Sequence, residues 1–349
     1  MVSVRNPYTK RGAILSPEDF FGRDQEIEDI YRRILGHQSV SLVGERRIGK
    51  SSILNALSFP EYREAFGIPD EFIFINVDCQ YIEGCPEDDF VDYLLMLICE
   101  QLRLVKPQPD KLALRRVSRE ARARGRYFVI VIDEFDRLVV NPQIPTEFFA
   151  FLRAWASEFE IPFVIASREG SLERLAETID TGSSFLNIFG NVYIGPFKSE
   201  EAEELMRIPA ENAGRPFSDE EVEIILSFAG YYPFFLQIAC YLMFNLKLSG
   251  VPFEQAKEQV RRNFAYEATP HFEYLLQRVT ENERAALRLW IQNARAVDHQ
   301  GYEGLLRKGI LIEGSAGTRL FSEIFSEMVR TQEGTRQGVV RTVRNTLLK

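Results

Sequence analysis

The chain has 349 residues, 45% of them hydrophobic and 27% charged, with a formal net charge of −9. This length suggests two or three domains with enough apolar material for a sizeable core. The acidic balance argues against a surface coated by nucleic acid, although it leaves room for a local basic patch. The four cysteines and three histidines show no zinc-ligand spacing, so we expect reduced thiols in a cytoplasmic protein. No apolar run approaches the roughly 18 residues of a membrane span, and no signal peptide precedes the chain, so no membrane partner is expected.

Short apolar runs alternate with amphipathic stretches over the first two hundred residues. Most of the runs are apolar almost throughout, as expected of strands that are covered on both faces. Helical patterns such as 88–102 and 145–159 separate them. The alternation predicts an α/β fold with a parallel sheet between layers of helices. The five expected strands are 39–43, 72–77, 128–132, 163–167 and 191–195.

The strand signal stops after residue 197, and the C-terminal part of the chain has a different pattern. Ser199 and Ser218 precede acidic residues and are expected to cap helices that glycines end. This predicts a small helical domain. From about residue 271, two helical patterns precede two strand-like runs and a further helix, which suggests a winged-helix-like domain. The expected divisions are an N-terminal arm at 1–16, a core at 17–198, helical and winged-helix-like domains at 199–270 and 271–335, and a basic tail or linker at 336–349.

A phosphate-loop spacing lies in VGERRIGKSS, between an expected strand and an expected helix, which is the context that the motif requires. Its backbone N–H groups would surround phosphate oxygens at a helix N-terminus. Lys50 would reach the β- and γ-phosphates, and the Ser51 hydroxyl would ligate Mg²⁺. The alternative is a glycine-rich turn without a ligand. The candidate nucleotide-binding residues are Gly44, Glu45, Arg46, Arg47, Ile48, Gly49, Lys50, Ser51 and Ser52.

Two further strands deliver polar residues at their carboxyl ends, where parallel sheets bind ligands. Asp133 would hold Mg²⁺ and its water shell, and Glu134 would orient the attacking water, unless the pair is a solvated acidic turn. Ser167, at the end of the next strand, could sense the γ-phosphate, and Arg168 could stabilise the transferred charge. An ordinary strand end with a surface arginine is the competing interpretation.

The chain contains, in this order, the motifs FFGRDQEI, VGERRIGKSSIL, FVIVIDEFD, FVIASRE, IGPFKSEEAEELM and FAGYYPFFLQIA. Together they resemble the STAND and archaeal-type ATPases of the AAA+-like P-loop group. The lead-in NPYTKRG…SPEDFFGRD also looks like the AAA-like ATPases of bacterial multidomain signalling proteins. The resemblance covers roughly residues 6–330. It implies a P-loop NTPase three-layer sandwich with a parallel five-stranded sheet, a helical lid domain and a winged-helix-like domain.

The resemblance also implies a strand order and further nucleotide contacts. The acidic strand would lie beside the strand that ends in Ser167, which would lie beside the loop strand. The box Phe21, Gly22 and Arg23 would line the adenine side, and Pro233 would begin a lid helix that closes over the nucleotide. Phe21 is equally well explained as a core aromatic residue, and Pro233 is also simply a good first residue of a helix.

Two departures from ring-forming motors favour a switch. Such motors carry an arginine before the fifth strand, where residues 175–194 contain neither Arg nor Lys, and another in the lid helix, where this chain reads GYYPFFLQ. Arg168 would then be the main cation near the γ-phosphate. The acids Asp133 and Glu134 are both present, so slow hydrolysis of ATP, with Mg²⁺, is expected.

A basic segment at 103–126 holds nine basic and two acidic residues, which could form a positive helix face for DNA or a solvated face balanced by acidic neighbours. The short helical pattern at 302–309 offers only Arg307 and Lys308 as cations, which favours protein packing over DNA binding. Three functions follow. The first is a nucleotide switch with ATP-dependent self-association and an effector or sensor partner. The second is a DNA-associated ATPase resembling initiator or transposition-regulator proteins. The third is a nucleotide-binding structural module.

Overall fold

The structure is a computed structural model that describes residues 4–167, 184–292, 300–314 and 317–331. The chain forms two compact units, one of residues 12–194 and the other of residues 1–11 together with 195–349. Each unit is described by itself. In the described residues no helix is both long and apolar enough to cross a membrane.

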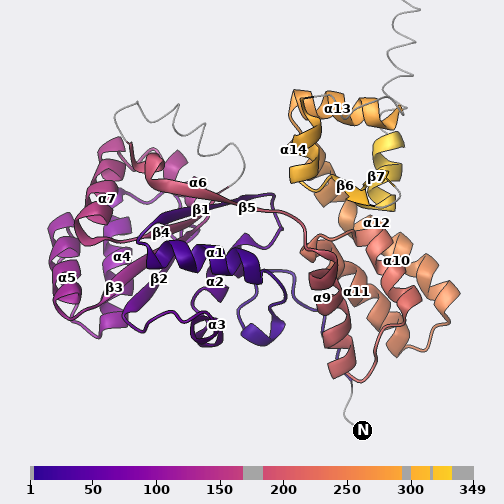
Figure 1. Cartoon of the computed structure of the whole chain (residues 1–349), viewed down its shortest axis with the longest axis horizontal. Helices are drawn as coiled ribbons and strands as arrows, with labels where there is room; N and C mark the ends of the chain where they lie inside the picture. The colour runs from indigo at the N-terminus through magenta and orange to yellow at the C-terminus, as the bar shows by residue number, and fades with distance from the viewer. Residues whose placement is uncertain (1–3, 168–183, 293–299, 315–316, 332–349) are drawn as a thin grey trace, which may run out of the picture. The chain divides into compact units, whose positions relative to one another are not determined.

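The first unit contains a five-stranded parallel sheet with the order β2-β3-β4-β1-β5 (Figure 1). The acidic strand β3 therefore lies beside β4, and β4 lies beside the loop strand β1, which confirms the predicted order. Each strand is found within two residues of its expected bounds, because apolar runs buried on both faces are the strongest strand signal. The strands are β1 (Ser39–Gly44), β2 (Phe72–Asp78), β3 (Tyr127–Asp133), β4 (Phe163–Ser167) and β5 (Phe189–Ile194).

Helices cover both faces of this sheet and complete three layers. On one face Tyr31 of α1 meets Phe74 of β2 edge to face, with 6.3 Å between ring centroids. The helices of this face are α1 (Asp24–Leu35), α2 (Lys50–Ala56) and α3 (Pro60–Ala65). On the other face lie α4 (Glu87–Leu102), α5 (Lys111–Ala123), α6 (Phe135–Val140) and α7 (Thr146–Phe159). The described residues of this unit also form two 3₁₀ turns, η1 (Pro17–Asp19) and η2 (Ser184–Ile188).

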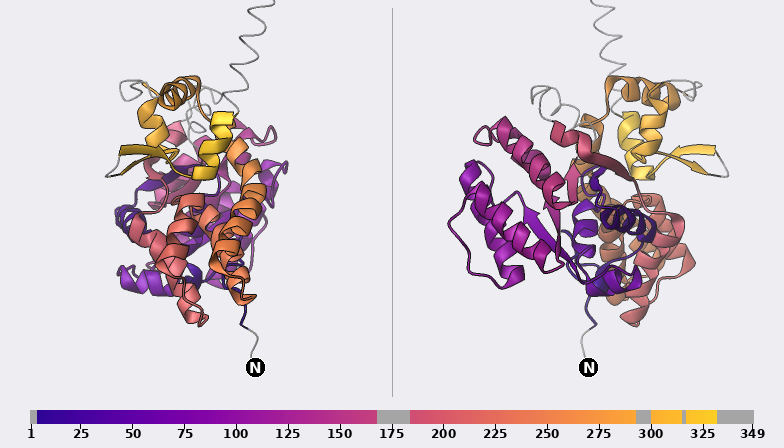
Figure 2. Two further views of the ribbon diagram at one scale, coloured as in Figure 1. Left: turned by 90° about the vertical axis from the view of Figure 1, so that its right-hand side faces the viewer. Right: turned by 60° about the vertical axis from the view of Figure 1, so that its left-hand side comes forward.

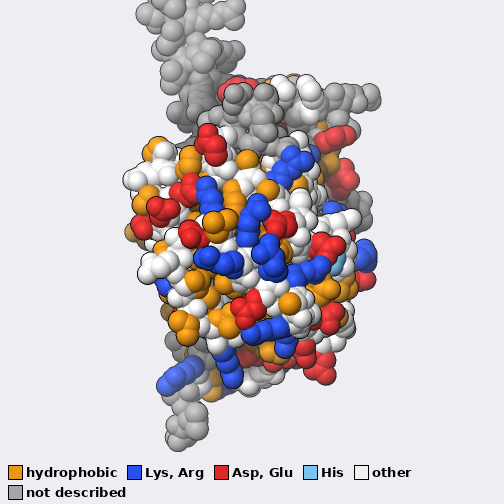
Figure 3. All heavy atoms as spheres, turned by 90° about the vertical axis from the view of Figure 1, so that its left-hand side faces the viewer, with side chains coloured by type: hydrophobic (Ala, Val, Ile, Leu, Met, Phe, Trp, Pro, Cys, Tyr) orange, Lys and Arg blue, Asp and Glu red, His pale blue; other side chains and the backbone are white. Residues whose placement is uncertain are grey.

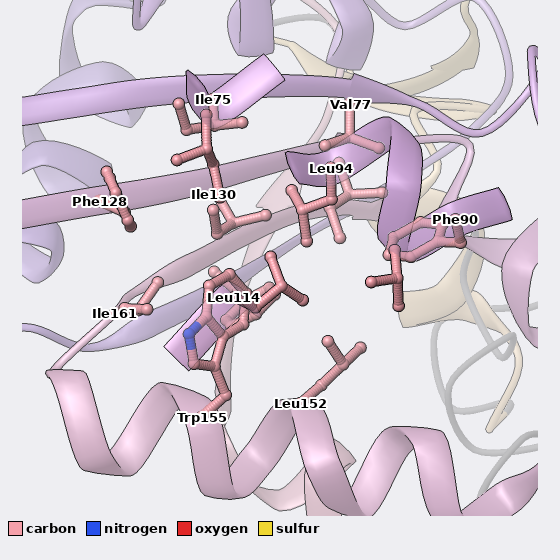
Figure 4. Packing of buried hydrophobic residues seen from close by; sticks show 14 of the residues in the cluster. Ile75, Val77, Phe90, Leu94, Leu114, Phe128, Ile130, Leu152, Trp155 and Ile161 are labelled. Atoms are coloured by element: carbon pink, nitrogen blue, oxygen red, sulfur yellow. The ribbon is translucent and has the colours of Figure 1, made fainter. Parts of the chain in front are cut away.

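The largest apolar cluster lies between the sheet and the second helical layer (Figure 4). Side chains such as Ile130 of β3 and Leu94 of α4 point toward Trp155 of α7, which is fully buried. The Trp155 Nε1–H donates to the Ser118 hydroxyl over 2.9 Å, so the indole is buried without losing a hydrogen bond. This packing holds β3 rigidly, and β3 ends at Asp133.

The second unit begins with a helical part of four helices, α9 (Ser199–Asn212), α10 (Asp219–Ala229), α11 (Pro233–Leu248) and α12 (Phe253–Gln277). The predicted boundary between residues 270 and 271 falls inside α12, which continues through Pro270. The N-terminal arm contributes to this unit, because Tyr8 is fully buried, donates its hydroxyl to the Met206 carbonyl and stacks on Phe217 at 5.7 Å.

The C-terminal part of the second unit follows the predicted order of elements (Figure 2). Helices α13 (Glu281–Ile291) and α14 (Tyr302–Arg307) precede an antiparallel hairpin of β6 (Leu311–Gly314) and β7 (Gly317–Leu320), and residues 323–331 are helical. Phe321 joins this part to the start of α11. Its ring lies 4.7 Å from that of Tyr232, and a Cβ on Gly230 would lie 2.6 Å from its carbonyl oxygen.

The two predicted helix caps have different outcomes. Ser218 caps α10: its Oγ accepts the Glu221 N–H, while the Glu221 carboxylate accepts the Ser218 N–H. For α9 the prediction was wrong by one residue, since Ser199 begins the helix and Lys198 is the N-cap, with its N–H bound by the Glu201 carboxylate. In both helices the glutamate three residues after the N-cap accepts the backbone N–H of the N-cap residue, and this hydrogen bond sets the position of the cap.

We therefore expect Ser218→Ala to lower the free energy of unfolding by about 1 kcal/mol, because it removes the acceptor of an N-cap hydrogen bond. Ser199→Ala is the matched control, since Ser199 caps nothing, and should change it by less than about 0.5 kcal/mol. Urea unfolding followed by circular dichroism measures both values. Equal effects of the two substitutions would contradict the assignment of the cap.

Candidate nucleotide site

The phosphate-loop residues lie between β1 and α2, at the carboxyl end of the sheet. Gly44 must be a glycine, since a Cβ there would lie 2.5 Å from the Ile194 carbonyl oxygen of β5. Gly49 is the N-cap of α2 with φ of 107°, a conformation that glycine adopts readily. Ile48 is buried and anchors the loop from below. Two glycines and one apolar anchor thus set the path of the loop.

The Lys50 ammonium lies against the loop itself. Its Nζ donates to the Gly44 carbonyl over 2.7 Å and to the Glu45 carbonyl over 3.0 Å. Arg46 and Arg47 are exposed, and Arg47 has a left-handed φ of 69°. Part of the Arg47 guanidinium is nevertheless shielded from water, and this partial desolvation, together with the neighbouring Arg46, lowers the pKa of Arg47 below its ordinary value. The side chains of these arginines therefore lie on the outside of the loop, while Lys50 is held at its centre.

The structure brings Ser51 and Asp133 together, although 81 positions separate them in the sequence. The Ser51 hydroxyl lies near the Asp133 carboxylate and, as a donor side chain, lowers the pKa of that carboxyl group. The Glu134 N–H donates to Asp133 Oδ1 over 2.9 Å. Burial raises the pKa of Asp133 above its ordinary value, although both of these donors lower it. A buried carboxylate that costs free energy to ionise is a favourable ligand for a cation, because the cation compensates the charge.

Glu134 is held at the N-cap of α6 with a left-handed φ of 51°. Its Oε2 lies 3.5 Å from Arg137 Nε, and Arg137 also pairs with Glu83 of the loop after β2. Sequence reasoning did not single out Arg137. It also missed Asp78, which ends β2 directly beside Asp133 in the strand register. The signal for Asp78 was present, since an acid that ends an apolar strand run is the same pattern that identified Asp133.

Ser167 lies at the predicted place, at the end of β4 between β1 and β3. It is almost fully buried, and its hydroxyl shares a hydrogen bond of 2.9 Å with the Ser41 hydroxyl of β1. Within this structure the Ser167 side chain therefore joins two strands. Arg168 lies outside the described residues.

The box at residues 21–23 lies beside the loop through Arg23. This arginine is buried and caps α1, where its Nη1 pairs with Glu26 at 2.9 Å. Its Nη2 donates to the Ile48 carbonyl over 3.2 Å, so Arg23 supports the phosphate loop from behind. The preceding segment also reaches α2, where the Ile14 N–H donates to the Ser52 hydroxyl over 3.0 Å. The family resemblance implied a place for Arg23 on the adenine side. Nothing in the sequence indicated its hydrogen bond to the Ile48 carbonyl.

The three other predicted nucleotide contacts are Phe21, Gly22 and Pro233. Phe21 is half-buried, and Gly22 has the left-handed φ of 64° that turns the chain toward Arg23. Pro233 is the first residue of α11, with Tyr232 as the N-cap, as the motif predicted. Pro233 belongs to the second unit.

The protein-family comparison decides the family. A model described as novel STAND NTPase 2 matches residues 36–297, well over half of the chain. The chain belongs to this STAND NTPase family. The match includes the phosphate loop, the acidic strand and the helical part of the second unit. No curated protein matches the sequence.

Solved structures share the fold of this STAND NTPase at low sequence identity. A Walker-type ATPase of Pyrococcus abyssi is 16% identical with a TM-score of 0.62, and the alignment covers 93% of this chain and 99% of that one. The ORC2 protein of Aeropyrum pernix, in ADPNP–ADP complexes, is 15% identical with a TM-score of 0.58, covering 95% and 98%. These likenesses support the P-loop ATPase architecture of the STAND NTPase.

The basic segment 103–126 lies largely on α5, as predicted, but its charges are mostly compensated (Figure 3). Figure 3 shows the side of the molecule that carries α5, where Lys and Arg side chains lie among Asp and Glu. Seven of the nine basic side chains lie within 4 Å of an acid. This favours the balanced face over a continuous DNA-binding surface. The pairs are Lys106–Asp92, Lys111–Glu87, Arg115–Glu158, Arg116–Asp110, Arg119–Glu158, Arg122–Glu160 and Arg124–Glu120.

Proposed function

We propose that this STAND NTPase is an ATP-binding switch that hydrolyses ATP slowly with Mg²⁺ and couples its nucleotide state to domain rearrangement or assembly. The observation that carries the proposal is the proximity of Ser51, in the first turn of α2, to the Asp133 carboxylate at the end of β3. It joins the phosphate loop to the acidic strand at the place where a metal-bound phosphate would lie. The membership in an NTPase family supports the same chemistry.

The residues around Ser51 and Asp133 fit Mg²⁺ and a nucleoside triphosphate. Ser51 and Asp133 offer a hydroxyl and a carboxylate, the hard oxygen ligands that Mg²⁺ accepts through one or two protein groups. When bound, Mg²⁺ would neutralise charge on the phosphates. The Lys50 ammonium would give up its hydrogen bonds to the two loop carbonyl groups and bind phosphate oxygens instead. The N–H groups of the loop would bind the remaining phosphate oxygens. Glu134 would orient the attacking water and accept its proton.

A switch is proposed over a ring motor because of the sequence between residues 175 and 194, which contains no Arg or Lys. A motor that completes its site with a neighbouring subunit needs a cation there. Without one, the transferred charge is stabilised less and turnover is slow. The nucleotide would then bias a conformational equilibrium through its different contacts in the ATP and ADP states.

The test is to size the protein with ADP, with the non-hydrolysable analogue ADPNP, and with ADPNP plus a DNA duplex, by light scattering after size exclusion. The proposal expects a larger assembly or a changed hydrodynamic radius with ADPNP alone. A change that requires DNA, and that disappears steeply with added salt, would favour the DNA-associated ATPase instead. Identical behaviour in all states would contradict both functions.

A further inference from the structure

The structure points to a peptide-binding groove along the open edge of β2, on the other side of this strand from β3. In the described residues β3 is the only strand that pairs with β2, so β2 forms one edge of the sheet. A groove with a cavity volume of about 620 Å³ runs along this edge. It lies between residues of α3 on one side and the ends of α4 and α5 on the other, and its floor includes Phe72, Phe74 and Asn76.

The strand register shows which main-chain groups face the groove. The Tyr127 N–H donates to the Glu71 carbonyl, and the Cys79 N–H donates to the Asp133 carbonyl. In a parallel pair, the N–H and C=O groups of one residue both point to the same side of its strand, and those of the next residue point to the opposite side. The odd-numbered residues of β2 therefore bond to β3, and the N–H and C=O groups of Phe74 and Asn76 face the groove. No bond to these main-chain groups is found within the described part of the chain.

The main-chain groups of Phe72, the first residue of β2, already have hydrogen-bond partners on the open side of the strand. An added strand would therefore begin after this residue. The Phe72 N–H donates to the Pro69 carbonyl, and the Phe72 carbonyl accepts from Arg63 Nη2 over 3.1 Å. Arginine side chains that bind an edge carbonyl are one way in which proteins protect an edge strand. From Phe72 to Asn76 the strand runs on for about 13 Å without such cover, enough for three or four residues of an added strand.

The charge of the groove selects the kind of partner. Arg63, Arg124 and Arg126 line it, and Asp70 is the acidic residue among its lining side chains. Arg126 Nη1 donates to the Asp70 carbonyl over 2.6 Å. The Asp70 carboxylate is fully exposed, and its Oδ1 lies 3.9 Å from Arg63 Nη2. Arg124 is balanced by Glu120 one turn away, so the surplus comes from Arg63 and Arg126 against the single carboxylate of Asp70. The groove therefore presents a surplus of positive charge.

We propose that this groove binds a partner protein through an extended segment that carries acidic side chains and adds a strand to β2. Edge donors and acceptors would give the affinity, and the arginines would select acidic side chains on the added strand. A nucleic-acid backbone fits less well, because its phosphates accept hydrogen bonds but cannot donate to the Phe74 and Asn76 carbonyls. The inference is separate from the nucleotide switch, since no residue of the groove belongs to the phosphate loop.

The test uses fluorescence anisotropy of a labelled octapeptide in which glutamate alternates with valine. We expect saturable binding that weakens at least tenfold in the double variant Arg124→Glu with Arg126→Glu. The matched control is Arg116→Glu with Arg119→Glu, which makes the same charge change on α5, outside the groove, and should alter affinity less than twofold. A peptide with N-methyl groups on alternate residues should bind at least tenfold more weakly, because it cannot pair with the edge.

Four outcomes would overturn the proposal. These are no binding of the peptide at millimolar concentration, equal affinity of the N-methylated peptide, equal loss in both double variants, or tighter binding of a labelled oligo-dT that the Arg124 and Arg126 changes abolish. Hydrogen exchange gives an independent readout, since the peptide should slow exchange of the Phe74 and Asn76 amides. Self-association that competes with the peptide would instead identify a second copy of the chain as the occupant.

Discussion

Lys50→Ala is expected to abolish the rise in melting temperature that Mg-ATP gives the unmodified protein. A ligand at a concentration a hundred times its Kd adds about 2.7 kcal/mol to the free energy of unfolding. The Lys50 ammonium lies at the centre of the loop, and each charge-assisted bond that it would make to phosphate contributes roughly 1.5–3 kcal/mol. Its removal should therefore weaken nucleotide binding by about 10²- to 10³-fold. Thermal unfolding with and without Mg-ATP measures the effect.

The matched control is Lys111→Ala, which removes the same side chain from α5, where it pairs with Glu87 at 2.6 Å. This variant should keep the full response to Mg-ATP. Without nucleotide, Lys50→Ala should unfold at nearly the temperature of the unmodified protein, because water can replace the ammonium at the half-exposed Gly44 and Glu45. A melting shift that survives in Lys50→Ala would refute the phosphate-loop assignment.

Glu134→Gln is expected to keep ATP bound and to lower the rate of hydrolysis by about 10²- to 10⁴-fold, the usual contribution of a general base. Glutamine keeps the shape of the side chain and can still accept a hydrogen bond from Arg137, but it cannot take a proton from water. Single-turnover release of phosphate gives the rate, and the melting shift with Mg-ATP reports binding. Retention of binding separates this effect from that of Lys50→Ala.

Glu83→Gln is the appropriate comparison for this variant, since Glu83 is the other carboxylate that pairs with Arg137. We expect its turnover to stay within a few-fold of the unmodified rate. Full turnover in Glu134→Gln would remove Glu134 from the proposed role. Equal losses in both variants would indicate that the charge balance around Arg137, and not the base, sets the rate.

The sheet could be predicted from the sequence because its strands are buried on both faces and read as unbroken apolar runs. The phosphate loop and Asp133 could be predicted because parallel strands bring their carboxyl ends to one edge. α12 was missed, although Ala256, Val260, Phe264 and Ala268 recur every four residues along its buried side. Pro270 conceals the pattern, since a proline ordinarily ends a helix.

Long-range polar contacts were beyond sequence reasoning. Arginine is rarely buried unless it is paired, so a single Arg23 gives no sign that it supports the Ile48 carbonyl. The bond between Ser167 and Ser41 depends on the register of β4 against β1, and neither residue type identifies its partner. Both cases join residues far apart in the chain, which only the assembled sheet brings together.

The contact of Phe321 with Gly230 and Tyr232 has a mechanical consequence. Gly230 and Tyr232 directly precede Pro233. Their contacts with Phe321 therefore attach the first turn of α11 to the C-terminal hairpin through packed rings and backbone. The 25-residue α12 then links the same two parts from the far end of α11. We therefore expect a displacement of Pro233 to be transmitted to the hairpin through these packed residues, so that the start of α11 and the hairpin move together.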